Sequence, residues 1–204
     1  MGIRNLFVTM GDPTRIGDYP EAMDSYDIVP TGLIELIKFQ FNQGLDKAGQ
    51  SIGQPTSFVV GGALSLTPKN REQEMKLLHK KVSHGADFAL TQPVFDPEAA
   101  IEFLSAYEET YGQSPPPIVA GIKPLYNSRN AEFLHNECRE SSSLKRSGRV
   151  CTRQPIRSRR VIIAQEIMAV LRPYVHGYYI MPAFGRYDLA ADVLDILNER
   201  APAA

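Results

Sequence analysis

The chain has 204 residues, of which 43% are hydrophobic and 22% charged, and its net charge is −1 at pH 7. This composition is typical of one soluble globular domain with a sizeable core, and it lacks the basic excess of nucleic-acid or anionic-membrane binders. No apolar run is long enough to span a bilayer and no signal peptide precedes the first predicted strand, so a cytoplasmic location is expected. Two cysteines, Cys138 and Cys151, have no metal-ligand spacing and no nearby histidine. Neither a metal site nor a disulfide framework is predicted.

The first predicted strand, residues 4–9, leads into a turn that contains a carboxylate. Its apolar residues are followed by Gly11-Asp12-Pro13, which must end a strand. The loop then continues without apolar periodicity to about Pro30, and loops of that length are often functional. Because α/β folds place polar chemistry where strands end, Asp12 is a candidate functional carboxylate. The local pattern leaves open the alternative that Asp12 only caps the next helix.

Helices and strands alternate along the rest of the chain. Thr31 is predicted to cap a helix over residues 32–43, and a helix over 71–84 should close at Gly85. Asp96-Pro97 opens the following helix, with proline in its first turn. Later helices are predicted from Asn127 to about His135, over Val161–Leu171 and over Leu189–Leu197. The predicted strands lie near residues 4–9, 57–61, 87–91, 117–121 and 177–181.

This alternation predicts an α/β fold with parallel strands and crossover helices. The strands are apolar throughout, as expected when both faces of a sheet are covered. No G-x-G-x-x-G string follows the first strand, which disfavours a doubly wound dinucleotide-binding sheet. Polar or small residues follow each strand, which favours a barrel with its site at the strand C-termini. Five strands cannot close a (β/α)8 barrel, so three strands are expected to be missing. The residues that follow the strands are Asp12, Gly61–Ala63, Gln92, Lys123 and Arg186.

Four strings of residues together resemble the methylenetetrahydrofolate reductase family. The likeness covers residues 4–136 and 161–198, and it is greatest to the reductase half of bacterial bifunctional proteins that also carry a homocysteine methyltransferase. That family folds as a (β/α)8 TIM barrel with FAD at its C-terminal face. The resemblance therefore implies a partial barrel, strands four to eight only, in one domain over residues 1–204 that is truncated at its N-terminus. The strings are Gly85-Ala-Asp-Phe-Ala-Leu-Thr-Gln-Pro-Val-Phe-Asp, which is specific, and the supporting Leu6-Phe-Val-Thr-Met-Gly-Asp-Pro, Pro117-Ile-Val-Ala-Gly-Ile-Lys-Pro and Ala183-Phe-Gly-Arg-Tyr.

The activity that the resemblance implies is the flavin-dependent reduction of 5,10-methylenetetrahydrofolate to 5-methyltetrahydrofolate. In the family, NADH or NADPH reduces FAD, and the reduced flavin passes a hydride to the methylene carbon of the folate. The choice between NADH and NADPH stays open. The family's general acid is a glutamate near the start of the barrel, in the part that this chain is expected to lack. The intact protein is expected to be a homo-oligomer, with a homocysteine methyltransferase domain as a candidate upstream fusion.

The resemblance assigns three polar residues to the folate. Asp12 matches the family aspartate near the flavin and the pterin, so the resemblance implies a catalytic and cofactor-binding role for it as well. The adjacent N–H donors of the pterin suit a carboxylate. Gln92 matches the glutamine that contacts the folate, because its amide both donates and accepts hydrogen bonds. The alternative for Gln92 is an ordinary polar residue at a strand end. Arg186 falls where the family has a substrate-binding arginine, with the glutamate tail as the expected partner.

The resemblance assigns four further residues to the cofactor. Gly61, Gly62 and Ala63 match small residues beside the flavin, where a larger side chain would block approach of the ring. Lys81 falls where the family has a lysine near the FAD phosphates. Asp12 and Gln92 are expected to approach one another across the strand C-termini, facing the same cavity as Gly62.

Alternatives remain at the level of residues and of the whole function. Lys81 is a lysine on a helix, and such residues are usually solvated. Arg186 would pair with Asp188 or Asp192 on the surface, where ion pairs contribute little. Tyr178-Tyr179 is expected to belong to the barrel wall and not to stack on a ligand. For the chain as a whole, the alternatives are a non-catalytic fragment that binds neither FAD nor folate and an unrelated TIM-barrel enzyme.

Residues 138–160 are interpreted as a frameshifted segment. The stretch holds both cysteines, is rich in arginine and serine, and contains no acid except Glu140. One set of synonymous codons for residues 137–149, read from the third base, encodes Met-Pro-Gly-Ile-Ile-Val-Pro-Glu-Glu-Ile-Arg-Glu. That string resembles the segment that relatives carry after the preceding helix. A genuine basic arm for an anionic partner and a disordered surface loop are the competing interpretations.

Overall fold

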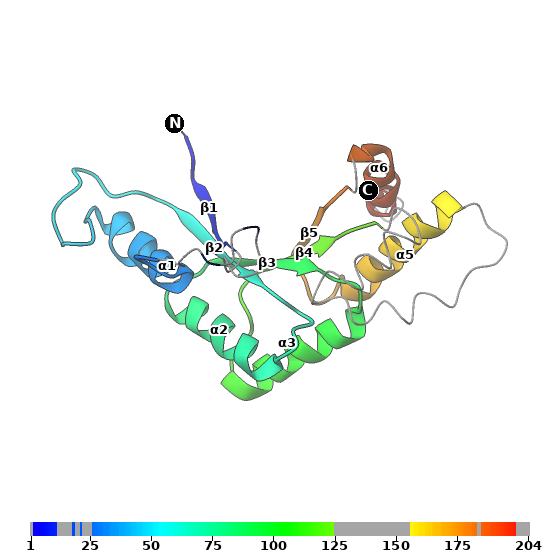
Figure 1. The fold of residues 1–204 in the computed structure, drawn as a ribbon, viewed down its shortest axis with the longest axis horizontal. Helices are drawn as coiled ribbons and strands as arrows, with labels where there is room; N and C mark the ends of the chain where they lie inside the picture. The colour runs from blue at the N-terminus through cyan, green and yellow to red at the C-terminus, as the bar shows by residue number, and fades with distance from the viewer. Residues whose placement is uncertain are drawn as a thin grey trace, which may run out of the picture. The chain divides into compact units, whose positions relative to one another are not determined.

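The computed structural model describes residues 2–11, 18, 21, 26–124, 156–182 and 185–198. Strands and helices alternate along the described chain, as the sequence predicts (Figure 1). The strands are β1 (Asn5–Val8), β2 (Val59–Leu64), β3 (Phe88–Pro93), β4 (Ile118–Ile122) and β5 (Gly177–Ile180). The helices are α1 (Pro30–Phe39), α2 (Arg71–Ser83), α3 (Pro97–Tyr111), α5 (Ile156–Leu171) and α6 (Tyr187–Asn198), with a short 3-10 helix, η2, at Phe41–Gln43.

The five strands form one parallel sheet in the order β1-β2-β3-β4-β5. β1 pairs with β2 from Asn5 opposite Val59 to Val8 opposite Gly62, and β4 pairs with β5 from Val119 opposite Gly177 to Ile122 opposite Ile180. Neighbours in sequence are therefore neighbours in the sheet, which confirms the predicted parallel α/β fold. The arrangement is the one expected of consecutive β/α units in a barrel.

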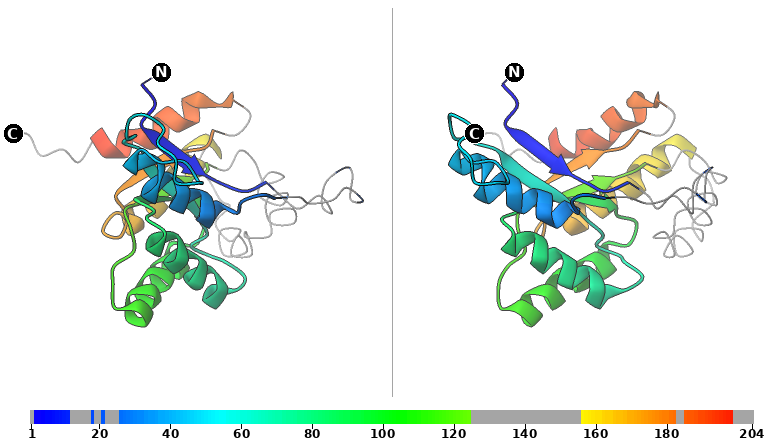
Figure 2. Two further views of the ribbon diagram at one scale, coloured as in Figure 1. Left: turned by 90° about the vertical axis from the view of Figure 1, so that its left-hand side faces the viewer. Right: turned by 60° about the vertical axis from the view of Figure 1, so that its left-hand side comes forward.

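The chain divides into two compact units, residues 1–64 with 75–90 and residues 65–74 with 91–204. In the first unit α1 packs on β1 and β2 and lies along them in both views of Figure 2. The contact is apolar, because every third or fourth residue of α1 is buried against one face of the strands. Its buried members are Val8, Ile34, Ile37 and Val60.

The core of the second unit forms where α5 and α6 pack together beside β4 and β5. Met168 and Val193 are almost completely buried there, at 2% and 0% exposure. Tyr178 packs against this cluster and donates a hydrogen bond to the carbonyl of Met168, with 2.6 Å between the two oxygens. The buried members are Ile122, Val161, Ala164, Met168, Leu189 and Val193.

The predicted start of α1 is wrong. The helix begins at Pro30 with Val29 at its N-cap, no side chain caps it, and Thr31 lies buried in its first turn. The physical reason is Pro30, whose fixed φ and missing N–H suit the first helical position and move the start upstream. By contrast Asp96 caps α3 as predicted, accepting a hydrogen bond from the Ala99 amide at 3.0 Å.

The prediction that the strands are covered on both faces is wrong for β1 and the start of β2. Val8 and Val60 are buried, at 6% and 0% exposure, whereas Phe7 and Val59 are 44% and 42% exposed. Burial therefore alternates along these residues because α1 covers only the face that carries Val8 and Val60.

Several predictions fall outside the described residues. They concern the helix from Asn127 to His135, both cysteines and residues 138–155. The last five residues of the segment interpreted as frameshifted, 156–160, belong to α5, so this helix begins before the Val161 start that was predicted. Within the described ranges, none of the helices has the length and apolar character needed to cross a membrane.

Candidate functional site

Three of the predicted cofactor residues lie together at β2: Lys81, Gly62 and Ala63. The Lys81 side chain is 7% exposed, and its ammonium donates a hydrogen bond to the carbonyl of Ala63. Its aliphatic stem lies beside Gly62, where an added Cβ would be 3.2 Å from the Lys81 Cδ. The interpretation of Lys81 as a solvated surface lysine is therefore wrong. This buried positive charge makes the end of β2 a candidate anion site.

The two glycines of β2 face opposite sides of the strand. An added Cβ at Gly61 would lie 2.3 Å from the ring of Phe88 on β3, whereas one at Gly62 would lie 3.4 Å from Ile34 on α1. Gly62 therefore faces the helices, and the expectation that it faces a ligand cavity does not hold. The reason is the strict alternation of faces along a strand, which gives adjacent small residues opposite directions.

A threonine hydroxyl lies between β3 and β4 next to Gln92. Gly121 receives a hydrogen bond from the Val94 amide at 2.9 Å, and a regular parallel ladder would then pair the Gly121 amide with the Gln92 carbonyl. The Gly121 amide donates to Oγ1 of Thr91 at 2.9 Å, and that hydroxyl donates to the Gln92 carbonyl at 2.7 Å. The Thr91 hydroxyl therefore bridges β3 and β4 where β3 reaches Gln92, whose side chain is exposed.

The carbonyl of Thr91 has a partner from β5. The hydroxyl of Tyr179 donates to it at 2.5 Å, and the phenol passes over Gly121. A Cβ at Gly121 would lie 2.9 Å from the phenol oxygen, so glycine is required for the ring to cross β4. Tyr178 bonds to Met168 and Tyr179 to Thr91, so both tyrosines of the predicted wall are held by the chain itself.

Arg186 is engaged by a neighbouring carboxylate. Its Nε and one terminal nitrogen donate to the two oxygens of Asp188, at 2.7 and 2.6 Å. Both side chains are more than a third exposed. This is therefore the surface ion pair with Asp188 that the sequence indicates as the alternative to substrate binding. Asp12 lies outside the described residues, so its predicted approach to Gln92 stays a prediction.

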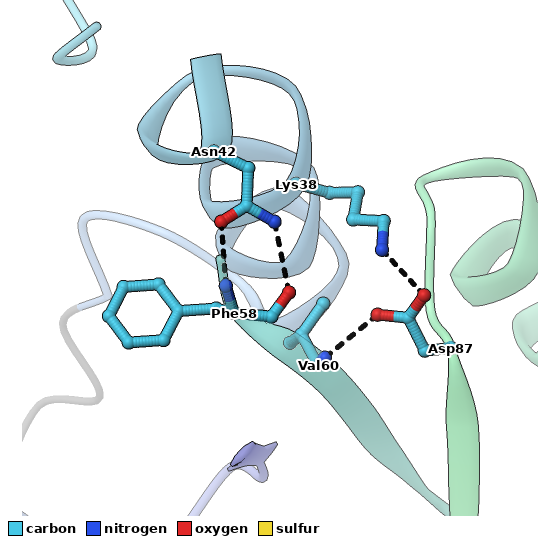
Figure 3. Close-up of polar contacts among 5 residues, drawn as sticks. All are labelled: Lys38, Asn42, Phe58, Val60 and Asp87. Carbon is cyan, nitrogen blue, oxygen red and sulfur yellow. Dashed lines mark hydrogen bonds and ion pairs between the residues drawn. The ribbon is translucent and has the colours of Figure 1, made fainter. Parts of the chain in front are cut away.

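The first four residues of the specific string, Gly85 to Phe88, make contacts within the first unit. The Asp87 carboxylate accepts from the Val60 amide at 2.9 Å and from the Lys38 ammonium at 2.5 Å, as Figure 3 shows. Gly85 has a φ of +92°, and an added Cβ would lie 2.5 Å from the Lys38 side chain. These residues join α1 to the starts of β2 and β3, which explains their types without a ligand.

Asn42 adds a second polar tie in the same unit. Its side-chain amide bonds to both the N–H and the C=O of Phe58, at 2.8 and 2.9 Å (Figure 3). Its oxygen also accepts from the Thr56 hydroxyl at 2.8 Å. The amide behaves like a strand neighbour for Phe58 just before β2 begins.

Sequence reasoning missed the roles of Thr91, Gly121 and Tyr179. Each lies in a quoted string or a predicted strand, but apolar patterning alone does not show that a hydroxyl bridges two strands. The available signal was the pair of small or polar residues, Thr91 and Gly121, inside otherwise apolar strands. Among the described residues, no group of three or more histidine, cysteine, aspartate or glutamate side chains could hold a metal ion.

Comparisons with known proteins agree with this architecture. A family model described as methylenetetrahydrofolate reductase matches residues 1–142. Methylenetetrahydrofolate reductase (NADH) 1 of Arabidopsis thaliana is 28% identical over 146 residues, which are 68% of this chain and 23% of the plant protein. A solved structure of an uncharacterized protein from Clostridium thermocellum, which binds two copies of 5-methyl-5,6,7,8-tetrahydrofolic acid, is similar with a TM-score of 0.50 and 20% identity. The alignment covers 70% of this chain and 53% of that one, so this chain spans only part of both relatives.

Proposed function

This chain belongs to the methylenetetrahydrofolate reductase family, and we propose that it forms part of an oxidoreductase that reduces 5,10-methylenetetrahydrofolate to 5-methyltetrahydrofolate. The observation that carries the proposal is the family match over residues 1–142, which includes Asp12, the β2 glycines, Lys81 and Gln92. The methylfolate bound by the Clostridium thermocellum protein, which shares the fold, supports a folate as the substrate class.

In this proposal, β1 to β5 correspond to strands four to eight of the family's (β/α)8 barrel. The support is the uninterrupted strand order and the likeness of the four strings to the family. The group that protonates the folate is proposed to come from residues outside this sequence, since no described carboxylate matches it by motif.

The residues at β2 fit a flavin with phosphates. Lys81 places a buried positive charge beside the carbonyl of Ala63, and a diphosphate would supply the opposite charge. Ala63 carries only a methyl group, which would not block a ligand. When bound, FAD supplies hydride transfer between a nicotinamide and the methylene carbon of the folate. The plant relative is named for NADH, so we propose NADH as the reductant to test first.

Three side chains are proposed to hold the substrate. Gln92 is exposed at the end of β3 and offers one donor and one acceptor face to a pterin edge. Arg186 would exchange Asp188 for the glutamate carboxylate of the folate, an exchange of low cost because the pair is exposed. Asp12 is proposed to bind the adjacent N–H donors of the pterin.

Titration of the purified chain with FAD, followed by the quenching of flavin fluorescence, tests the cofactor part of the proposal. We expect saturable binding that Lys81→Met weakens and that Lys80→Met leaves unchanged, because Lys80 is an exposed neighbour on the same helix. Riboflavin, which has no phosphates, should bind Lys81→Met and wild type equally. Absence of FAD binding by the wild-type chain would contradict the flavin assignment.

Calorimetry with 5-methyltetrahydrofolate tests the substrate part separately. Gln92→Ala should weaken binding, whereas Gln113→Ala, a change of the same kind in the loop after α3, should not. If wild type binds FAD but Gln92→Ala binds the folate as tightly as wild type, Gln92 does not contact the substrate.

A further inference from the structure

We propose that Tyr179 is a positioning residue for Gln92, acting through the peptide that links Thr91 to Gln92. The inference rests on the proposed function, in which Gln92 contacts the folate. Tyr179 lies on β5, two strands away from Gln92 in the order of the sheet. Its hydroxyl nevertheless bonds to the residue immediately before Gln92.

The backbone at Gln92 is held by the side chain of the residue before it. The Thr91 hydroxyl accepts a hydrogen bond from the Gly121 amide and donates one to the Gln92 carbonyl. Thr91 is 2% exposed and its carbonyl accepts a hydrogen bond from Tyr179, so Tyr179→Phe removes a bond made in a buried setting.

Tyr179 adds a second restraint, at the carbonyl of the peptide that precedes Gln92. Its hydroxyl fixes the Thr91 carbonyl while the Thr91 hydroxyl fixes the Gln92 carbonyl, so two successive carbonyls are held in place. The Thr91 carbonyl lies in the peptide before Gln92 and the Gln92 carbonyl in the peptide after it, so the two bonds restrain the backbone on both sides of the Gln92 Cα and with it the direction in which the side chain leaves the strand. Burial raises the pKa of the Tyr179 hydroxyl, which keeps it protonated and donating throughout the physiological range.

Gly121 is the residue that permits this arrangement. With any side chain at position 121, the added Cβ would lie 2.9 Å from the phenol oxygen and 3.0 Å from the Met181 Cε. Gly121→Ala should therefore displace the phenol from Thr91 and reproduce the effect of removing the hydroxyl.

A double-mutant cycle on folate binding tests the coupling. Tyr179→Phe keeps the ring and removes one hydrogen bond, so we expect about fivefold weaker binding of 5-methyltetrahydrofolate. The same change in a Gln92→Ala background should have no further effect, because the residue it positions is gone. Tyr178→Phe is the matched control: it removes an equivalent hydroxyl-to-carbonyl bond, to Met168, and should leave folate binding unchanged. Equal weakening by Tyr179→Phe in both backgrounds would overturn the proposal.

A second measurement does not depend on folate binding. In nitrogen-15 spectra of the chain, Tyr179→Phe and Gly121→Ala should shift the side-chain amide resonances of Gln92, and Tyr178→Phe should not. If the wild-type chain binds no folate, the proposed function fails while the spectra still decide the positioning role. Unchanged Gln92 resonances in Tyr179→Phe would overturn that role whatever the chain binds.

Discussion

Gly61 is required by packing inside the chain, whatever ligand approaches β2. An alanine there would place its Cβ within 2.3 to 2.5 Å of three atoms of the Phe88 ring. We expect Gly61→Ala to lower the free energy of unfolding by about 1–3 kcal/mol, the usual cost of overpacking. Urea denaturation of the variant measures this change.

Two further variants identify the cause of that loss. Gly177→Ala on β5 meets no atom within 4 Å and should change stability by less than about 0.5 kcal/mol. Adding Phe88→Leu to Gly61→Ala should recover part of the loss, because the smaller side chain vacates the contact. No recovery would show that Phe88 is not the obstacle.

Tyr178 and Tyr179 make stability depend on pH in the alkaline range. Burial raises the pKa of both hydroxyls above 10.0. The unfolded chain therefore loses these protons at lower pH than the folded chain, so their contribution is complete below about pH 10 and is lost as pH rises through the folded values. The free energy of unfolding should fall above pH 10, and less steeply in Tyr178→Phe/Tyr179→Phe. Equal slopes in the variant and the wild type would contradict this origin.

At the scale of elements, Asp87 joins α1, β2 and β3. Val60 is 0% exposed, so removal of the Asp87 carboxylate leaves a buried amide without its partner. We expect Asp87→Ala to cost about 1–3 kcal/mol and Asp87→Asn less, since asparagine keeps an acceptor. Lys38→Met should cost under about 1 kcal/mol, because the ion pair is partly exposed at 29% and 30%. Thermal denaturation ranks the three variants, and an equal loss for Lys38→Met would assign the stability to the ion pair instead.

Element types and their order could be predicted from the sequence, because apolar runs, turn residues and helix periodicity are local signals. Boundaries were less accurate where two local signals competed, as at Pro30 and Thr31, where proline sets the helix start and the threonine is buried. One-sided burial at Phe7 could not be predicted, since an apolar residue looks the same whether or not another element covers it.

The candidate site was predicted as a set of residues but not as a geometry. The family resemblance selected Lys81, Gly62 and Ala63, and the structure brings these three together. The direction of Gly62 depends on strand alternation and on the position of α1, so the resemblance alone could not give it. The contact between the Thr91 hydroxyl and Gly121 depends on the long-range register of β3 and β4, which no local pattern encodes.

Also at the scale of elements, the interpretation of residues 138–160 as a frameshifted segment stays a prediction. The family match ends at residue 142, close to the start of this stretch. Resequencing the locus should reveal a shifted frame, and the restored frame should encode a Pro-Gly-Ile and Pro-Glu-Glu-Ile segment. An uninterrupted frame, together with a tryptic peptide of the written sequence from the native host, would establish the basic segment as genuine.

At the scale of the whole molecule, we expect the 204-residue chain to be a poor catalyst by itself. It spans 23% of the plant relative, and the proton donor is proposed to lie outside it. Positioned proton transfer typically contributes about 10²–10⁴-fold to a rate, so NADH-dependent reduction of methylenetetrahydrofolate should be at least about 100-fold slower than in the full-length plant enzyme. A rate comparable to that enzyme, measured on the purified chain, would place a working acid among the residues of this sequence.

We expect substitutions at the two ends of the string from Gly85 to Gln92 to have different effects on protein abundance and on function. Gly85, Asp87 and Phe88 contact α1 and β2, whereas the exposed Gln92 side chain stands at the other end of the same strand. In a library of single substitutions sorted once for protein abundance and once for folate-dependent growth, changes at 85–88 should deplete in both sorts. Changes at 92 should survive the abundance sort and deplete only in growth. One part of this family signature is therefore constrained by folding and another by chemistry, and paired selections for abundance and for growth can separate the two.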